Sequence, residues 1–61
     1  MVYLVINDIE QPDYTEVSLH RTLAGAGRSY QAARTGNMRR VIDANGRDVT
    51  GAALDAANAG R

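Results

Sequence analysis

The chain has 61 residues and no net charge, with seven Arg, no Lys and seven Asp or Glu. It contains no Cys, Trp or Phe, and ten of its apolar residues are Ala. This composition excludes a disulfide-bonded or thiolate-metal domain, and the length allows one domain at most. A domain of this size buries only about 60% of its unfolded surface, so we expect it to rely on oligomerisation or an obligate partner.

The charges are sorted along the chain. Residues 1–16 hold four acidic residues and no basic one, a net of −4, whereas residues 17–47 hold six Arg and one Asp, a net of +5. Residues 48–61 have a net of −1. Such asymmetry bears on partners rather than on fold. The basic segment can meet nucleic-acid phosphates, an acidic protein surface, or the acidic N-terminal segment.

Residues 1–7 are rich in β-branched and aromatic side chains, which predicts a strand. Its apolar residues do not alternate with polar ones, so both faces of the strand should be covered. One face can meet the helices of the domain, and the other needs a second sheet or a second copy. We therefore expect a homo-oligomer or obligate complex that forms through the strand between Val2 and Ile6. Residues 7–13, which include Pro12, are expected to form a loop.

Residues 15–24 carry two competing patterns. The alternation of Thr15, Val17 and Leu19 fits a strand, whereas Leu19 and Leu23, followed by Ala and Gly, fit a helix and its C-terminal stop. We favour the helix, with Thr15 or Asp13 as its N-cap. The Gly-Ala-Gly sequence at residues 25–27 is then a flexible connection to the next element.

Two further short helices are expected. Residues 29–35 predict a helix that is capped by Ser29 and ends at Gly36 or Asn37. Residues 51–59 predict a C-terminal helix that has Thr50 as its N-cap, docks through Leu54 beside alanines 53 and 57, and stops at residue 60.

Residues 38–50 predict a β-hairpin that turns at Asn45-Gly46. This dipeptide supplies the two positive φ angles of a type I′ turn. The turn pairs Ile42 with Val49 on the buried face. It also places the aspartates at positions 43 and 48 opposite each other, an unfavourable pairing that a one-residue bulge would relieve. The whole chain is thus expected to be a small α+β domain: an N-terminal strand, two short helices, the hairpin and a C-terminal helix.

Enzyme chemistry has little support in the sequence. The single histidine, His20, lies in an apolar stretch and has no suitably spaced partner for general-base catalysis, so we interpret it as structural. The acidic residues of the N-terminal segment do not match the spacing of a calcium loop. The glycines before Arg28 lack the preceding strand and the Lys of a phosphate-binding loop. We expect no catalytic activity, no cofactor and no metal.

The arginines are the one constellation that suggests a function. If residues 29–35 form a helix, two arginines lie near its ends, two begin the hairpin and one follows the hairpin tip. A helix and an adjacent hairpin that carry Arg are how winged helix-turn-helix domains contact DNA. The candidate contact residues are Arg28, Tyr30, Gln31, Arg34, Arg39, Arg40 and Arg47.

Two families resemble parts of this pattern. The order helix, turn, helix, Gly36 and hairpin in residues 17–50 resembles the small winged helix of excisionases and MerR-like proteins, which implies DNA binding. The second family is the ribosomal S-four-type RNA-binding domain, whose pattern is partly matched by Leu19, Leu23, Ala26-Gly27, Ser29, Ala32, Gly36, Asn45-Gly46 and Val49. Neither resemblance assigns the chain to a family.

Two functions follow as expectations. The first is a small non-enzymatic nucleic-acid-binding regulator of the type found on phages and mobile elements, with DNA favoured over RNA. The second is a protein-interaction module, such as a small inhibitor, antitoxin or accessory subunit, which docks its Arg face on an acidic partner. No segment approaches the roughly 20 apolar residues of a membrane span, and the N-terminus lacks a signal-peptide pattern, so we expect a cytoplasmic protein that has no membrane partner.

Overall fold

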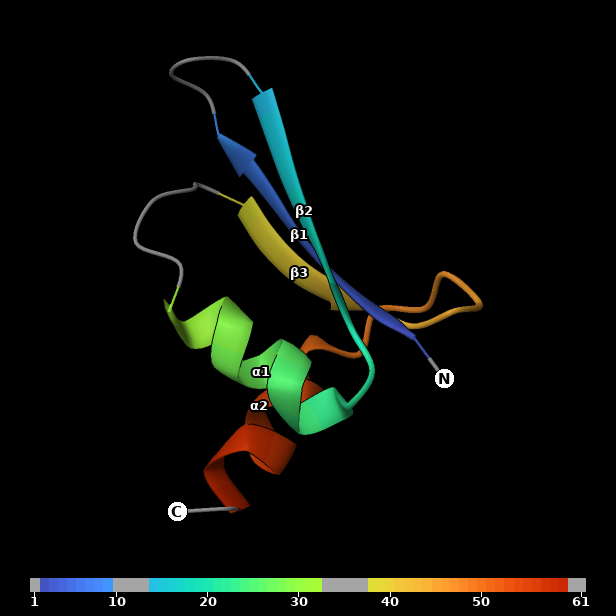
Figure 1. Cartoon of the computed structure of the whole chain (residues 1–61), viewed down its shortest axis with the longest axis vertical. Helices are drawn as coiled ribbons and strands as arrows, with labels where there is room; N and C mark the ends of the chain where they lie inside the picture. The colour runs from blue at the N-terminus through green and yellow to red at the C-terminus, as the bar shows by residue number, and fades with distance from the viewer. Residues whose placement is uncertain (1, 10–13, 33–37, 60–61) are drawn as a thin grey trace.

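The computed structural model describes residues 2–9, 14–32 and 38–59. These residues form β1 (Tyr3–Ile9), β2 (Tyr14–His20), α1 (Leu23–Ala32), β3 (Met38–Ile42) and α2 (Thr50–Ala59) (Figure 1). The α+β class expected from the sequence is confirmed, as are the N-terminal strand and the C-terminal helix. The expected loop over residues 7–13 is wrong in its first part, because β1 continues to Ile9; Pro12 lies outside the described residues.

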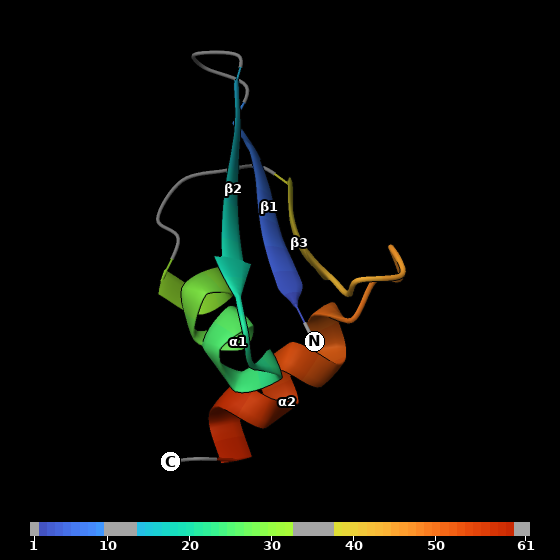
Figure 2. The same ribbon diagram turned by 45° about the vertical axis from the view of Figure 1, so that its right-hand side comes forward.

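The three strands form one antiparallel sheet in the order β2-β1-β3. In the central strand, Val5 lies opposite Ser18 of β2 and Val41 of β3. Both helices lie on the same side of this sheet, and the end of β1 and β2 near residues 10–13 projects beyond them (Figures 1 and 2). The described helices therefore cover one face of the sheet.

The core between sheet and helices is very small. Its buried centre consists of Val5 and Val41 from the sheet with Ala26 and Ala53 from the helices. Four half-buried residues pack around this centre: Tyr3, Leu23, Tyr30 and Val49. The lack of Phe and Trp in the sequence is thus matched by a core in which alanines fill the helix side.

The two helices approach each other very closely at Gly27. A Cβ atom on this residue would collide with the carbonyl oxygen of Ala53, lie 2.7 Å from its carbonyl carbon, and lie 2.9 Å from the Cβ of Ala57. Glycine inside a helix costs about 1 kcal/mol relative to Ala, but here the packing requires it. The expected flexible connection at residues 25–27 is therefore wrong, because tertiary packing holds these residues inside α1.

The start of α1 is set by Thr22. The Gly25 N–H donates to the Thr22 hydroxyl at 3.0 Å, and the Ala26 N–H donates to the Thr22 carbonyl at 3.1 Å, which is the geometry of an N-cap. Ser29 consequently lies in the middle of a helix and does not cap one. Residues 29–32 of the expected helix form the second half of α1, whereas residues 33–35 and the expected end at Gly36 or Asn37 lie outside the described residues.

Residues 15–24 do not form the expected helix, because most of them belong to β2. Alternation decides the structure: Thr15, Val17 and Leu19 share one face, and the intervening residues face the helices. Pairing along the whole of β1 supplies the main-chain hydrogen bonds that a helix would otherwise supply. The Thr15 hydroxyl donates to the Asp8 carboxylate at 2.9 Å instead of capping a helix.

The chain turns at Asn45-Gly46 as expected, but the turn has a different type. Among the described residues, Gly46 alone has a positive φ, at 81°, whereas type I′ requires two. The Gly46 N–H donates to the Asp43 carbonyl and the Asp43 N–H donates to the Arg47 carbonyl, both at 3.0 Å. These bonds describe a three-residue turn that ends in a left-handed glycine, and its extra residue separates Asp43 from Asp48.

The extra residue shifts the pairing beyond the turn by one position. Ile42 lies opposite Asp48, and the Val49 N–H donates to the Val41 carbonyl at 2.8 Å. The expected pairing of Ile42 with Val49 on the buried face is therefore wrong. A one-residue shift moves a strand's side chains to the opposite face, so Val41 faces the core and Ile42 faces away.

Helix α2 begins at Thr50, but the Thr50 side chain does not cap it. Its hydroxyl accepts from the Val41 N–H at 2.9 Å, which ties the helix start to β3. The Asp48 carboxylate accepts from the Thr50 N–H at 2.9 Å. Ala53 and Ala57 are buried as expected, whereas Leu54 is only half-buried, so the alanines dock this helix.

We predict that Gly27→Ala lowers the free energy of unfolding by about 1–3 kcal/mol, because the added methyl group forces the helices apart. Gly51→Ala is the matched control, since a Cβ at that exposed helical position meets nothing within 4 Å. It should leave stability unchanged or raise it by up to about 1 kcal/mol. Urea unfolding followed by circular dichroism measures both. A Gly27→Ala variant as stable as the parent would contradict the close helix contact.

Candidate functional site

The face of the sheet opposite the helices is largely apolar. Val5 and Val41 point into the core, so their neighbours along each strand point the other way. The outward apolar residues are Leu4, Ile6, Val17, Leu19, Met38 and Ile42. The strand register places five of them side by side, whereas Met38 lies opposite Asp8, on the far side of Arg40. We call this surface the open face.

Three of these side chains are strongly exposed. Val17 is 58% exposed, and Leu19 and Met38 are each 66% exposed. Single exposed apolar residues are ordinary, but several on neighbouring strands form a patch. The non-alternating sequence of β1 led us to expect that both of its faces are covered. The described helices cover one of them, and the other forms the middle of the open face.

One corner of the open face is polar. The Arg40 guanidinium lies 3.2 Å from the Asp8 carboxylate, and each side chain is 42% exposed. The hydroxyl of Thr15, and after it Arg40, lower the pKa of Asp8 below its ordinary value. The pair joins the acidic N-terminal segment to the basic middle segment. Its charges cancel, so this corner adds little net charge to the face.

The arginines expected to form one contact surface lie in separate places. Arg39 stacks over the Tyr30 ring, 4.8 Å from its centroid, and donates to the Tyr30 carbonyl at 3.1 Å on the helix side of the sheet. Arg40 lies on the opposite face beside Asp8. Arg47 lies beyond the turn, where it pairs with Asp43 at 3.3 Å. The structure therefore does not bring these three side chains together.

The remaining candidate residues lie on or after α1. Arg28 is exposed, and the Gln31 amide donates to Asn58 of α2 at 3.0 Å, so that side chain links the two helices. Arg34 lies outside the described residues. Because residues 14–20 are strand β2, they do not supply the first helix of the helix-turn-helix pair that a winged helix requires.

Asp43 organises the turn next to Arg47. Its buried carboxylate accepts from the N–H groups of Asn45 and Arg47, both at 2.9 Å. The Arg47 N–H is the largest cause that lowers the pKa of Asp43 below its ordinary value. Arg47 thus stabilises the turn through its main chain and its guanidinium, a role that the sequence did not reveal.

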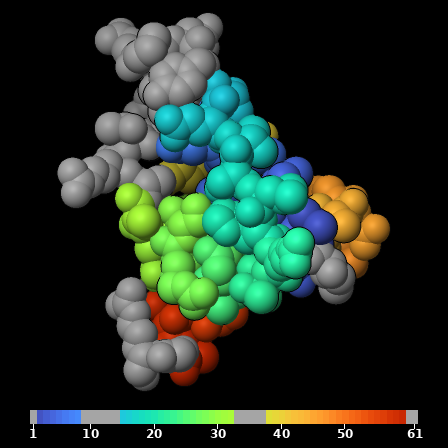
Figure 3. Space-filling view, viewed as in Figure 1, coloured from blue at the N-terminus to red at the C-terminus, as the bar shows by residue number. Residues whose placement is uncertain are grey.

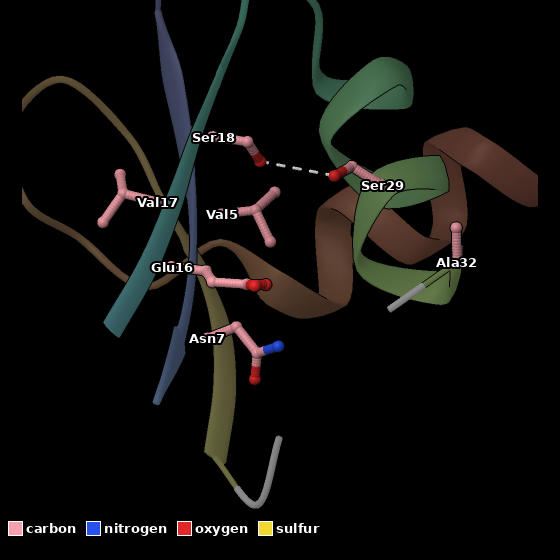
Figure 4. A pocket seen from close by; sticks show the side chains of 7 residues that line it. All are labelled: Val5, Asn7, Glu16, Val17, Ser18, Ser29 and Ala32. Atoms are coloured by element: carbon pink, nitrogen blue, oxygen red, sulfur yellow. Dashed lines mark hydrogen bonds between the residues drawn. The ribbon is translucent and has the colours of Figure 1, made fainter. Parts of the chain in front are cut away.

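An open pocket with both polar and apolar lining residues lies between the sheet and α1. Its volume is about 500 Å³, and its lining includes Val5, Asn7, Glu16, Ser18, Ser29 and Ala32. Figure 4 shows Glu16 and Ser18 extending from the sheet toward α1, whereas the side chain of Val17, on the other face, points away.

Ser18, which lines the pocket, contacts a histidine: its hydroxyl lies 2.9 Å from Nε2 of His20. The same hydroxyl lies 3.3 Å from the Ser29 hydroxyl (Figure 4). Sequence reasoning missed Ser18, although two residues separated by one position in a strand face the same side. A catalytic dyad also needs a group that orients the base. In the described part of the chain, Ser18 is the one hydrogen-bond partner of His20, and both residues belong to β2. The Ser18–Ser29 contact is the one that joins this strand to α1.

Residues 2–9, 14–32 and 38–59 contain no group of three side chains suited to hold a metal ion. No helix within these ranges combines the length and apolar character needed to cross a membrane. Comparisons with protein-family models, curated proteins and solved structures give no match. The functional argument therefore rests on the geometry of the open face.

We predict that the protein loses stability as the pH falls below about 4. Hydrogen bonds lower the folded-state pKa values of Asp8, Asp43 and Asp48 below their ordinary value of 3.8. Their stabilisation is thus present above that value and is lost as the pH falls through the lowered values. Urea unfolding between pH 7 and pH 2 measures the loss.

The variant Asp43→Ala should be less stable at pH 7 and should lose less stability on acidification. The control is Asp55→Asn, which removes an exposed carboxylate of α2 and leaves the turn intact. Equal acid sensitivity of the parent and Asp43→Ala would contradict the assigned role of Asp43.

Proposed function

We propose that this chain is a small non-enzymatic protein-interaction module that docks a partner protein on the open face of its sheet. The observation that carries the proposal is the cluster of outward apolar side chains around Val17 and Leu19, with the exposed Met38 at the far end of the same face. Large apolar patches on small domains mark interaction surfaces. A cytoplasmic location remains part of this proposal.

The energetic reason is the imbalance between core and surface. Complete burial of a Val, Leu or Met side chain contributes about 1.5–3 kcal/mol, and this domain leaves three of them largely in water. Its buried centre contains two valines and two alanines, so the domain has little stability to spare. A partner that covers the open face supplies the burial that the helices do not, which makes an obligate complex favourable.

The proposed docking surface differs from the one that the sequence suggested. An Arg-rich face was expected to meet an acidic partner, but the open face presents apolar residues and one arginine, Arg40, already paired with Asp8. The partner surface that fits is apolar at its centre and polar opposite this corner. Strand β1 takes part through Leu4 and Ile6, because both of its hydrogen-bonding edges are used within the sheet.

The competing proposal is the nucleic-acid-binding regulator. Its support is the exposure of Arg21, which follows β2, and of Arg28, which lies within α1. It has less support than docking, because Arg39 and Arg47 are held by Tyr30 and Asp43, and Arg40 lies on another face. Phosphate binding gains strength from several arginines on one surface.

We predict that photo-crosslinking from Met38 captures a partner protein. Photo-methionine replaces Met38 on the open face, and the variant Met38→Leu is the matched control, which keeps Met1 as the other labelled position. Irradiation in the source cell should give a discrete protein adduct that disappears in the control. Mass spectrometry then identifies the adduct as another protein or a second copy.

The opposite result combines two observations. One is the absence of a Met38-dependent adduct. The other is micromolar binding to duplex DNA, single-stranded DNA or RNA that weakens by orders of magnitude between about 50 and about 200 mM salt. A loss of this binding in the double variant Arg21→Gln, Arg28→Gln would assign the chain to nucleic acid. Both arginines are exposed, so their replacement leaves the core intact.

We predict that Ser18 does not react with a fluorophosphonate, a reagent that labels activated serine nucleophiles. Its hydroxyl contacts His20, but within the described residues His20 has no carboxylate partner to orient it. Intact-mass spectrometry should show no adduct, with a serine hydrolase in the same tube as the positive control. Labelling that His20→Gln abolishes would overturn the non-enzymatic proposal.

A further inference from the structure

The outer edge of β2 carries main-chain groups that the sheet does not use. This follows first from β3, where the Val41 carbonyl accepts from Val49 and the Val41 N–H donates to Thr50, both away from β1. Val41 lies opposite Val5 of β1. Val5 and Val41 therefore form a non-hydrogen-bonded pair of the antiparallel ladder. In such a pair the main-chain groups of both residues point away from each other, so those of Val5 point toward β2.

The same alternation fixes the direction of each group in β2. Val5 pairs with Ser18, so the Ser18 main chain bonds inward to β1. Main-chain direction alternates along a strand, so the N–H and C=O groups of Thr15, Val17 and Leu19 point outward, away from β1. β2 is the last strand on its side of the sheet, and no other described strand lies beyond it.

This edge carries one feature that disfavours strand pairing, the charge of Glu16, and lacks the others. The seven residues of β2 contain no Pro, Lys or Arg, and they pair with β1 without a bulge. Figure 3 shows β2 at the molecular surface along its length. The edge of β3 differs, because its Val41 and Asp43 groups are occupied by the segment that follows the turn.

We propose that two copies of this chain associate through β2, whose outer edges pair antiparallel to give a continuous six-stranded sheet. A two-fold axis through Val17 pairs Thr15 of one copy with Leu19 of the other. This register pairs all seven residues of each strand. It also places Glu16 opposite Ser18 of the second copy, whereas a shift that pairs Thr15 with Val17 places the two Glu16 carboxylates opposite each other.

A second copy is the occupant that this edge fits best. An antiparallel pair of identical strands is self-complementary, so each copy offers the same three donors and three acceptors to the other. Val17 and Leu19 of both copies then lie side by side on one continuous open face. The association uses the edge of the sheet rather than its face, so it stands whether or not the open face binds another protein.

The test measures the mass of the protein by light scattering after size exclusion across a concentration series. The parent should form a dimer, and Val17→Pro should be a monomer at every concentration, because Pro removes an N–H that points outward and keeps the inner ladder. Val17→Thr is the matched control, since it keeps the N–H and the β-branched shape and should remain dimeric. A parent that stays monomeric at millimolar concentration overturns the proposal.

The register is tested with two charged variants. Val17→Lys and Val17→Glu each place like charges across the axis and should be monomers, whereas an equimolar mixture should form a heterodimer. Ile6→Thr changes the open face away from this edge and should not alter dimerisation. If the mixture of the two charged variants stays monomeric, the proposed strand register is wrong. If Ile6→Thr abolishes the dimer, the copies associate through their open faces and not through the edges of β2.

Amide hydrogen exchange on the parent tests the edge without a variant that must fold. The N–H groups of Thr15, Val17 and Leu19 should become at least tenfold more protected as the concentration rises through the dimerisation range. Those of Glu16, Ser18 and His20 should be protected at all concentrations because they bond within the sheet. Rapid exchange at Val17 in a sample that is dimeric by light scattering would show that the copies meet elsewhere.

Discussion

The close contact between α1 and α2 at Gly27 is the constraint on which the rest of the structure depends. There the backbone of one helix touches Ala53 and Ala57 of the other, and no side chain larger than hydrogen fits at position 27. Small residues let two short helices form one compact layer, although glycine is a poor helix former. The same residues bury little apolar area, so the layer that covers the sheet adds few large side chains to the core.

The distribution of apolar residues over the two faces of the sheet follows from this small helix layer. Val5 and Val41 occupy the covered face, while Leu4, Ile6 and Ile42 lie on the face away from the helices. The covered side also carries polar residues, among them Asn7 and Ser18, so the uncovered side is the more apolar of the two. Much of the apolar side-chain volume of the chain lies on the face that its own helices leave uncovered. Proteins that bury such a face against another protein have this arrangement.

The sequence predicted the elements whose local signals were strong. Asn45-Gly46 located a turn, and the apolar run after Met1 located the central strand with both faces apolar. The turn type was wrong because Gly46 alone takes the left-handed conformation, and the extra residue moved the core position from Ile42 to Val41. The like-charged pairing of Asp43 with Asp48 had suggested a one-residue bulge, but the hydrogen bonds of Asp43 that fix the turn could not be predicted from the sequence.

The middle of the chain was mispredicted because tertiary contacts overrode local preference. Thr15, Val17 and Leu19 carried the alternation of a strand, but the spacing of Leu19 and Leu23 suggested a helix, and those two leucines belong to different elements. Because this segment is a strand, the structure lacks the helix pair on which the DNA-binding hypothesis depended. The arginines also could not be placed from sequence, since their separation depends on which face of β3 each one occupies and on partners such as Tyr30 and Asp8.

The bond between the Thr50 hydroxyl and the Val41 N–H determines how far an assembly of this chain can extend. With Val49, it occupies the outward main-chain groups of Val41 at the end of β3 near the turn, so this part of the β3 edge cannot pair with another strand. A domain whose sheet has two unpaired edges can add copies at both edges and form fibres. A domain with one unpaired edge forms a closed dimer. In the dimer proposed above, Thr50 would therefore help to keep β3 from pairing with a further copy.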